Sequence, residues 1–291
     1  MQTGGRTDLA VELKEGLQAG AECQNGMSCR EEFHKHKNVH VSTVVISDEE
    51  AAKVMGKQIG TYITVEAPGL SGADEKRRRY VAEILAEKLL SLTGKTEGKS
   101  ILVVGLGNRD VTPDALGPQV VDNLFITRHI LMEYGSYAFG KEPVNRISGL
   151  VPGVMAQTGM ESLEIIKGVV NETKPDVVLT VDALAARSMK RLGRTIQLTD
   201  TGIVPGSGVG NHRNAINKEN LGVPVISIGI PTVVDAATIV ADAVNANREM
   251  TEKIMSPQLN GMFVTPKNID DTIKQLGFLV SEGLNIAFSK E

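Results

Sequence analysis

The chain has 291 residues, 41% of them hydrophobic, which suffices for a sizeable core and excludes an intrinsically disordered protein. The net charge of -4 disfavours direct binding of nucleic acid, and no hydrophobic stretch reaches the roughly 20 residues that a membrane-spanning helix needs. Two cysteines and a polar N-terminus without a secretory signal lead us to expect a cytoplasmic protein.

The first third of the chain predicts an irregular lead-in followed by two strands and a helix. Residues 1–38 are polar, and we expect an extended segment with a short helical stretch around residues 11–17. Residues 40–47 and 60–66 are rich in β-branched side chains, which predicts two strands that pair with each other. Hydrophobic residues recur at helical spacing in residues 76–92, so we expect an amphipathic helix there.

The rest of the chain alternates unbroken hydrophobic segments with helical patterns. We expect strands at residues 100–105, 175–181 and 223–229, helices at residues 112–129, 183–190 and 235–248, and a long helix from residue 265 to the end. Strands of this kind, alternating with helices, predict an α/β fold with a mainly parallel central sheet flanked by helices. No repeat or linker interrupts the pattern, so we expect one domain behind an N-terminal extension.

Acidic residues follow the predicted core strands. Asp110 and Asp114 lie in the loop after residues 100–105, Asp182 follows residues 175–181, and Asp235 follows the third strand. Ligands bind beyond the carboxyl ends of strands in open α/β sheets, so these carboxylates are predicted to converge. Two close carboxylates share a proton, which leaves one as a water-activating base and the other as a proton donor, with no metal needed.

A structural explanation competes with this one for both candidate acids. The sequence Thr112-Pro113-Asp114 has the pattern of a helix start, with an N-cap, a proline and a first-turn acid. Asp182 stands in front of the predicted helix at residues 183–190 and has the right position to cap it. Position alone leaves both explanations open.

Other motifs predict less. Residues 105–110 begin like a dinucleotide-binding fingerprint, but Asp110 stands where its third glycine belongs. The Gly-rich residues 205–211 lack the lysine of a phosphate-binding loop, and Ser207 with His212 is a weak hypothesis for a serine hydrolase.

A cluster near the N-terminus has the residue types of a zinc site. Its members are Cys23, Cys29, His34, His36 and His40. The interval between the two cysteines is longer than usual for zinc, so we favour a solvated polar extension over a metal site.

Several motifs taken together resemble the germination proteases of endospore-forming bacteria. They are residues 104–108, 112–118, 127–129, 151–155, 182–187, 201–211 and 231–235. The resemblance extends from residue 6 to about residue 245 and resumes from residue 262 through the final helix. It implies an endopeptidase of the spore core that degrades small acid-soluble spore proteins during germination. It also implies an atypical aspartic peptidase with a fold similar to the hydrogenase-maturation proteases.

The resemblance places the family's two essential aspartates on Asp114 and Asp182, two of the acids that the loop argument nominates. It implies no cofactor and no metal, a homotetramer, and spore proteins rather than nucleic acid or membrane as partners. From the chemistry of carboxylate pairs we infer that these two residues activate water and protonate the leaving amine.

The N-terminus contains a second family feature. Substrates of these proteases are cut before the large hydrophobic residue in a motif of Thr, an acid, a large hydrophobic residue, Ala, a small residue and Glu, and residues 7–12 read Thr-Asp-Leu-Ala-Val-Glu. The resemblance implies a zymogen that cuts itself between Asp8 and Leu9, with residues 1–8 as pro-segment and residues 9–291 as a single α/β peptidase domain. We hypothesise that the short Asp8 side chain slows this cut until acidification protonates it.

Two other functions remain open at the level of sequence. One is a metal-dependent maturation peptidase of similar fold, in which Asp182 and a His or Glu ligate the metal. The other is a noncatalytic module that binds spore proteins, against which the presence of both Asp114 and Asp182 argues. The chain also departs from longer family members, because only about a dozen residues join Glu249 to Met262 where those members have a large insertion.

Overall fold

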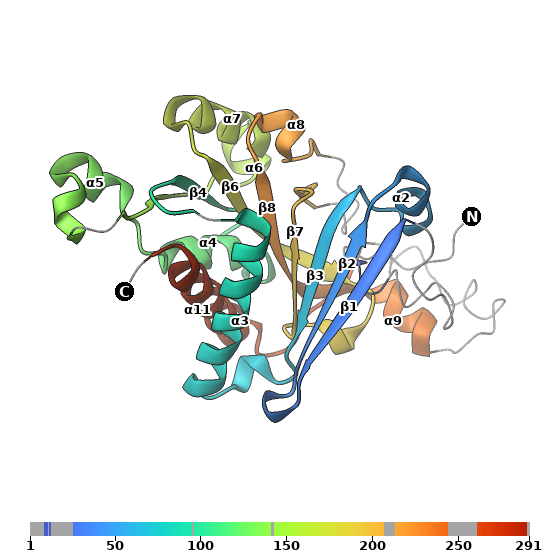
Figure 1. The fold of residues 1–291 in the computed structure, drawn as a ribbon. Helices are drawn as coiled ribbons and strands as arrows, with labels where there is room; N and C mark the ends of the chain where they lie inside the picture. The colour runs from blue at the N-terminus through green and yellow to red at the C-terminus, as the bar shows by residue number, and fades with distance from the viewer. Residues whose placement is uncertain are drawn as a thin grey trace.

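The computed structural model describes residues 9–10, 12, 26–94, 96–140, 143–206, 213–243 and 261–289. Within these ranges a single sheet runs through the centre of the molecule, with helices on both of its faces (Figure 1). None of the described helices combines the length and the hydrophobicity that crossing a bilayer requires.

The sheet has a parallel part and an antiparallel part. Its strands follow the order β1-β2-β3-β7-β8-β6-β4-β5, with the short β9 paired to β8. The parallel strands are β8 (Val225–Asp235), β6 (Val177–Ala186), β4 (Ser100–Gly105) and β5 (Arg146–Leu150). The antiparallel strands are β1 (Met27–His34), β2 (Val39–Ile46), β3 (Gly60–Glu66), β7 (Thr195–Thr199) and β9 (Phe263–Val264).

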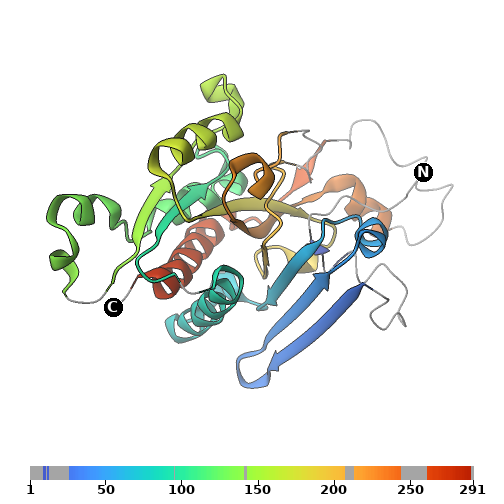
Figure 2. The same ribbon diagram turned by 45° about the horizontal axis from the view of Figure 1, so that its top comes forward.

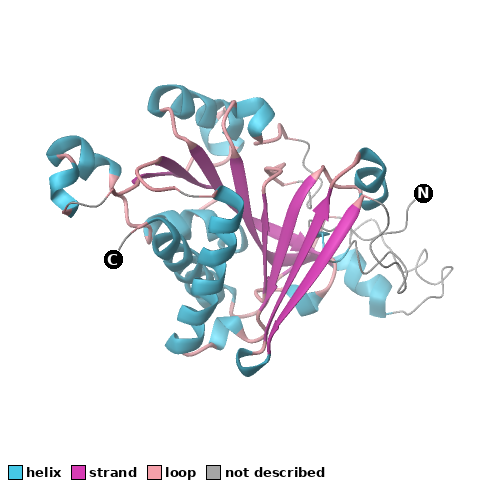
Figure 3. Cartoon of the chain, in the orientation of Figure 1, coloured by secondary structure: helices cyan, strands magenta, loops and turns pink. Residues whose placement is uncertain are grey.

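The helices vary from one turn to more than five turns (Figure 3). They are α2 (Glu49–Met55), α3 (Glu75–Thr93), α4 (Leu116–Asp122), α5 (Arg128–Tyr134), α6 (Met155–Thr158), α7 (Ser162–Thr173), α8 (Lys218–Leu221), α9 (Ala236–Ala243) and α11 (Ile269–Phe288). The two longest, α3 and α11, lie side by side on one face of the sheet (Figure 2).

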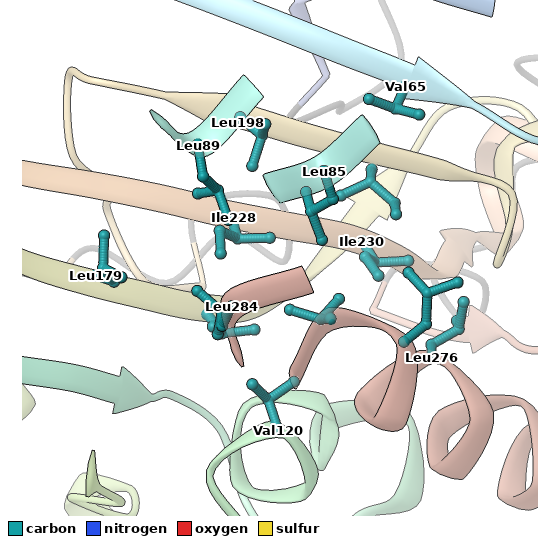
Figure 4. Close-up of a cluster of buried hydrophobic side chains, with 14 of the residues drawn as sticks. Val65, Leu85, Leu89, Val120, Leu179, Leu198, Ile228, Ile230, Leu276 and Leu284 are labelled. Carbon is teal, nitrogen blue, oxygen red and sulfur yellow. The ribbon is translucent and has the colours of Figure 1, made fainter. Parts of the chain in front are cut away.

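The main hydrophobic core lies between α3, α4, α11 and the sheet. Leu85 of α3 and Leu284 of α11 point toward Leu179 of β6 and Ile228 of β8, and all four are buried (Figure 4). A second cluster on the opposite face joins α7 and α8 to the alternate residues of β4 and β6, such as Val178. Both faces of the central strands are therefore covered, as their unbroken hydrophobic sequences predict.

The structure confirms the α/β class and most of the elements expected from hydrophobic patterning. β3 and β4 have the predicted bounds, β2 and α3 differ by one residue at each end, and β2 pairs with β3. The three predicted core strands are present as β4, β6 and β8, of which β6 and β8 begin two residues later and extend further than predicted. β5, which was not predicted, adds a fourth parallel strand, and the antiparallel strands make the whole sheet mixed. The final helix is present as α11 and begins four residues later than predicted.

The helix predicted at residues 183–190 is wrong. Strand β6 continues through these positions to Ala186, because Ala183 and Leu184 pair with Ile230 and Pro231 of β8. A bulge follows Leu184, and only the turn at Met189–Arg191 is helical. The helix propensity of the Ala-Leu-Ala-Ala sequence is overridden by pairing with the neighbouring strand.

The single helix predicted at residues 112–129 is also wrong. A 3-10 turn at Thr112–Asp114 leads into α4, and α5 starts only at Arg128. Backbone groups between the two helices bond to distant parts of the chain instead of continuing the helix: the N–H of Phe125 donates to Oδ1 of Asn285, and that of Thr127 to the carbonyl of Ile147.

The prediction of an irregular lead-in fails for its last part. Residues 27–34 form β1, which pairs along its whole length with β2. The helical stretch predicted around residues 11–17 lies outside the described residues except for Glu12, and so does the second half of the helix predicted at residues 235–248. The first half of that helix is present as α9.

Candidate active site

A cleft of 340 Å³ lies at the carboxyl-terminal ends of β4, β6 and β8. Both Asp114 and Asp182 line it. This is the edge of the sheet at which the α/β topology collects functional groups. The volume lies in the range of ligand-binding clefts. The two acids nominated by the sequence are therefore brought together by the fold.

Asp182 belongs to β6, where it stands opposite Gly229 of β8. It is 5% exposed, and its Oδ1 accepts a hydrogen bond of 2.9 Å from the backbone N–H of Ala183. No helix follows it, so the capping explanation that the sequence left open does not apply to Asp182. A carboxylate in a continuous strand, buried beside a cleft, calls for another explanation than capping.

Asp114 approaches from the loop that follows β4. It closes the 3-10 turn ahead of α4, and the N–H of Asn108 donates to its Oδ2 at 2.9 Å. Gly107 makes this possible, since it has a φ of +106° and a Cβ there would lie 2.0 Å from the carbonyl oxygen of Asp114. Gly107, which in the sequence resembled part of a dinucleotide fingerprint, thus allows the backbone of Asp114 to pack close to it.

Burial raises the pKa of Asp114 above its ordinary value. The hydrogen bond from Asn108 and the positive charge of Arg213 act in the opposite direction, but desolvation is the larger effect. Asp114 therefore keeps its proton to a higher pH than an exposed aspartate does. A carboxyl group that holds its proton more tightly than usual, beside a second carboxyl group, provides the residue types of an acid and a base for hydrolysis.

Close packing of β4 against α4 brings the two acid-bearing segments together. The N–H of Leu106 donates to the carbonyl of Val181 at 2.8 Å, directly before Asp182. Gly117, in the first turn of α4, lies against both segments: a Cβ there would be 2.3 Å from the carbonyl oxygen of Leu106 and 2.6 Å from that of Val181. Side-chain-free backbone at this point allows α4 to start beside β6.

The sequence did not single out the other polar side chains of the cleft. Arg213 lines it, and so do Ser162, Thr232 and Thr265. Thr265 Oγ1 donates to the carbonyl of Thr232 at 2.9 Å, which ties the segment after β9 to β8. The available signal for Arg213 was its position two residues after the Gly-rich residues 205–211.

Other acids nominated by the sequence lie elsewhere. Asp110 is exposed, and it accepts a hydrogen bond of 3.1 Å from Nε2 of Gln157, so it belongs to a surface turn. Asp235 accepts from the N–H of Thr238 at 3.0 Å and caps α9. Ser207 and His212 lie outside the described residues, as does Asp8, whereas Leu9 is fully buried.

The members of the predicted Cys/His cluster take different partners. His34 hydrogen-bonds to the hydroxyl of Tyr80 at 2.8 Å, and His40 contacts the carboxylates of Glu31 and Glu66. His36 is exposed in the turn between β1 and β2, and Cys23 lies outside the described residues. Within the described ranges, no three His, Cys, Asp or Glu side chains group in a way that suits a metal ion.

Comparison with known proteins confirms the resemblance seen in the sequence. Residues 6–247 match the family model of germination proteases. The germination protease of Caldanaerobacter subterraneus is 45% identical to this chain, covering 98% of it and 94% of the relative, and that of Clostridium tetani is 39% identical with 97% and 94% covered.

The germination protease of Bacillus velezensis is 38% identical over 350 aligned positions, more than the 291 residues of this chain, so that relative contains residues without a counterpart here. Among solved structures, a [NiFe] hydrogenase maturation protease, HycI, from Thermococcus kodakarensis matches 69% of this chain and 99% of its own length at 21% identity, with a TM-score of 0.35.

Proposed function

The chain belongs to the germination protease family, and from that premise we propose that it is an aspartic endopeptidase whose Asp114 and Asp182 hydrolyse the peptide bond. A protease role in spore germination follows from the family itself. The observation that carries the aspartic mechanism is the single cleft lined by both carboxyl groups, one of them with a raised pKa.

The two acids divide the chemistry between them. Ionised Asp182 takes a proton from water as the water oxygen bonds to the scissile carbonyl carbon. Protonated Asp114 donates its proton to the amide nitrogen, and the C–N bond breaks to release a carboxylic acid and an amine. The burial that raises the pKa of Asp114 suits it to the role of donor, and the backbone N–H of Ala183 orients the Asp182 carboxylate beside the cleft.

The substrates in this proposal are small acid-soluble spore proteins. The active form is a homotetramer of this chain, which cleaves them in the spore core. The first cut is the chain's own, between Asp8 and Leu9. Support comes from the family match, which begins at residue 6 and includes this site, and from the similarity of residues 7–12 to the substrate motif.

Peptide cleavage by the purified chain tests the mechanism. A peptide containing Thr-Glu-Phe-Ala-Ser-Glu is incubated with the wild type and with Asp114→Asn, Asp182→Asn and Asp110→Asn variants, with and without EDTA, and mass spectrometry locates the cut. We expect cleavage after the first Glu that survives EDTA, falls at least 100-fold in the first two variants and persists in Asp110→Asn.

Each other outcome selects a different function. Cleavage that EDTA abolishes indicates a metal-dependent peptidase, in which Asp182 is a ligand. Binding of the peptide without any cleavage, by a sample that mass spectrometry shows to begin at Leu9, indicates a noncatalytic module. Equal loss of activity in Asp110→Asn would mean that the assay reports folding and not chemistry.

A further inference from the structure

The N-terminal segment at residues 9–12 is held inside the protein at its described positions. Leu9, Ala10 and Glu12 are 0%, 1% and 8% exposed. Each is bound by side chains or backbone from distant parts of the sequence. Such complete burial shows that a groove suited to these side chains exists on the folded protein.

Leu9 occupies a hydrophobic pocket next to the cleft. It packs with Leu184, Ala186 and Val234, and Leu184 also lines the cleft that holds Asp114 and Asp182. Alternate residues of a strand face the same side, so Leu184 continues the face of β6 that carries Asp182, about 7 Å further along the strand. The pocket that takes a large hydrophobic side chain therefore adjoins the carboxyl groups.

Glu12 is bound by the main chain just beyond the end of β6. Its Oε2 accepts from the N–H of Arg187 at 2.8 Å, and its Oε1 accepts from the N–H of Ser188 at 3.0 Å. Two consecutive backbone donors on one carboxylate form an anion-binding concavity. Bonds to an ionised acceptor are stronger than neutral ones, so this position discriminates a carboxylate from an amide.

Ala10 lies between these two positions, against the antiparallel part of the sheet. Its N–H donates to Oε1 of Gln197 at 2.7 Å. Its methyl group packs in a cluster with Val44, Ile46 and Tyr62, where it is almost completely covered. The space around Ala10 fits a small side chain.

We propose that Leu9, Ala10 and Glu12 occupy the subsites that bind a peptide substrate on the leaving-amine side of the scissile bond. The groove selects a large hydrophobic residue directly after that bond, a small residue second and a carboxylate fourth, through the Leu184 pocket, the surroundings of Gln197 and the N–H groups of Arg187 and Ser188. The chain's own segment competes with substrates for these subsites. This inference deepens the proposed function and rests on it for the direction of cleavage.

Binding measured without cleavage tests the groove separately from the chemistry. A fluorescent peptide that copies residues 4–16 is titrated into the full-length Asp182→Asn variant, and its anisotropy gives a Kd. Replacing the peptide glutamate that corresponds to Glu12 by Gln is expected to raise the Kd about tenfold, and replacing the leucine that corresponds to Leu9 by Asp is expected to raise it further.

The reciprocal change is made in the protein. Glu12→Gln in the same full-length background weakens the chain's own segment, so we expect the unmodified peptide to bind about tenfold more tightly, while Glu83→Gln on the exposed side of α3 leaves its Kd unchanged. Thermal unfolding of both variants shows whether each is folded.

The outcomes separate the groove from the function. Peptides with Glu and Gln that bind equally well, or a Glu12→Gln variant that is folded and binds no more tightly, would overturn the groove and leave Glu12 as an anchor of the fold. If the wild type cleaves nothing but the binding differences appear as expected, the groove stands and the proposed function fails. If the wild type cleaves its substrates but its KM is the same for peptides with Glu and with Gln at the fourth position, the proposed subsites are wrong while the proposed function stands.

Discussion

The backbone N–H of Leu106 and the carbonyl of Val181 are joined at 2.8 Å, so β4 and β6 separate only where their acid-bearing segments begin. Gly117 lies against this junction. We expect Gly117→Ala to destabilise the protein by about 3 kcal/mol, because the added methyl group meets backbone that has no room to move. Gly168→Ala in α7 is the matched control: its Cβ meets nothing within 4 Å, and we expect it to stabilise by about 0.5 to 1 kcal/mol. Urea unfolding measures both, and equal effects would refute the packing argument.

The pKa of Asp114 predicts a pH-dependent stability difference. A folded-state pKa above the unfolded value contributes stability that is complete below the unfolded pKa and is lost as the pH rises through the folded pKa. This stability is lost at neutral pH, so Asp114 destabilises the fold at pH 7 relative to a neutral side chain of the same shape. We expect Asp114→Asn to raise the melting temperature by roughly 1 to 3 °C at pH 7, and this difference should vanish at about pH 3, below the unfolded pKa. A gain that is the same at both pH values contradicts the assignment.

Arg213 tunes the same group through its charge. Its removal eliminates a cation that lowers the pKa of Asp114, so that pKa should rise further in Arg213→Ala. If Asp114 is the proton donor, the alkaline limb of the pH–kcat profile moves to higher pH in Arg213→Ala and stays near its wild-type position in Arg213→Lys. If the alkaline limb does not move in Arg213→Ala, the charge of Arg213 does not act on the group that donates the proton.

An ion pair joins β1 to α3 and gives a pH dependence of the opposite sign. Lys88 Nζ, on a side chain that is 9% exposed, donates to Oε2 of Glu32 at 2.8 Å and lowers the pKa of that carboxyl. This stability is present above the unfolded pKa and lost as the pH falls through the folded one. We expect Glu32→Gln to lower the melting temperature at pH 7 by about 2 °C and to have no effect near pH 3. Glu83→Gln, from an exposed pair with Arg79, should change it by less than about 1 °C at either pH.

The proposed self-cleavage between Asp8 and Leu9 predicts that Asp and Glu at position 8 give different maturation rates. If a short or ionised side chain at position 8 slows the cut before Leu9, Asp8→Glu matures faster than the wild type at neutral pH, and the wild type approaches its rate on acidification. Mass spectrometry of purified chains sampled over time measures the form that begins at Leu9. Equal rates at neutral pH would sink the hypothesis.

The elements that the sequence predicted correctly are those whose own residues decide their structure. Unbroken hydrophobic runs defined β4, and helical spacing defined α3. β1 was missed because it is an edge strand with charged residues such as Arg30 and Glu31, and only its pairing with β2 makes it a strand. The end of β6 was missed for a related reason, since its partner lies far away in the chain.

The candidate site was predictable where topology alone places a residue. Asp114 follows β4 and Asp182 lies in the neighbouring parallel strand β6, so the strand order brings them to one edge. Arg213 and the groove for Leu9 were not predictable, because the loop that carries Arg213 and the segment that fills the groove reach the cleft through contacts between elements distant in sequence. Asp110 and Asp114 lie in the same loop after β4, but Asp110 lies at the surface, where it binds Gln157. Only the geometry of the turn decides which of the two acids reaches the cleft.

Strand β6 carries both Asp182 and Leu184, and these two residues pair in unbroken register with Gly229 and Pro231 of β8, ahead of the bulge that follows Leu184. In the proposed mechanism, the reacting carboxylate of Asp182 and the Leu184 wall of the substrate pocket are thus parts of one paired strand segment. Binding at the wall fixes the separation between the scissile bond and Asp182, so the entropy of aligning the two is lost when the substrate binds and not during the reaction. A residue inserted or deleted between Asp182 and Leu184 would shift this alignment by a whole strand position and turn the wall to the other face of the sheet.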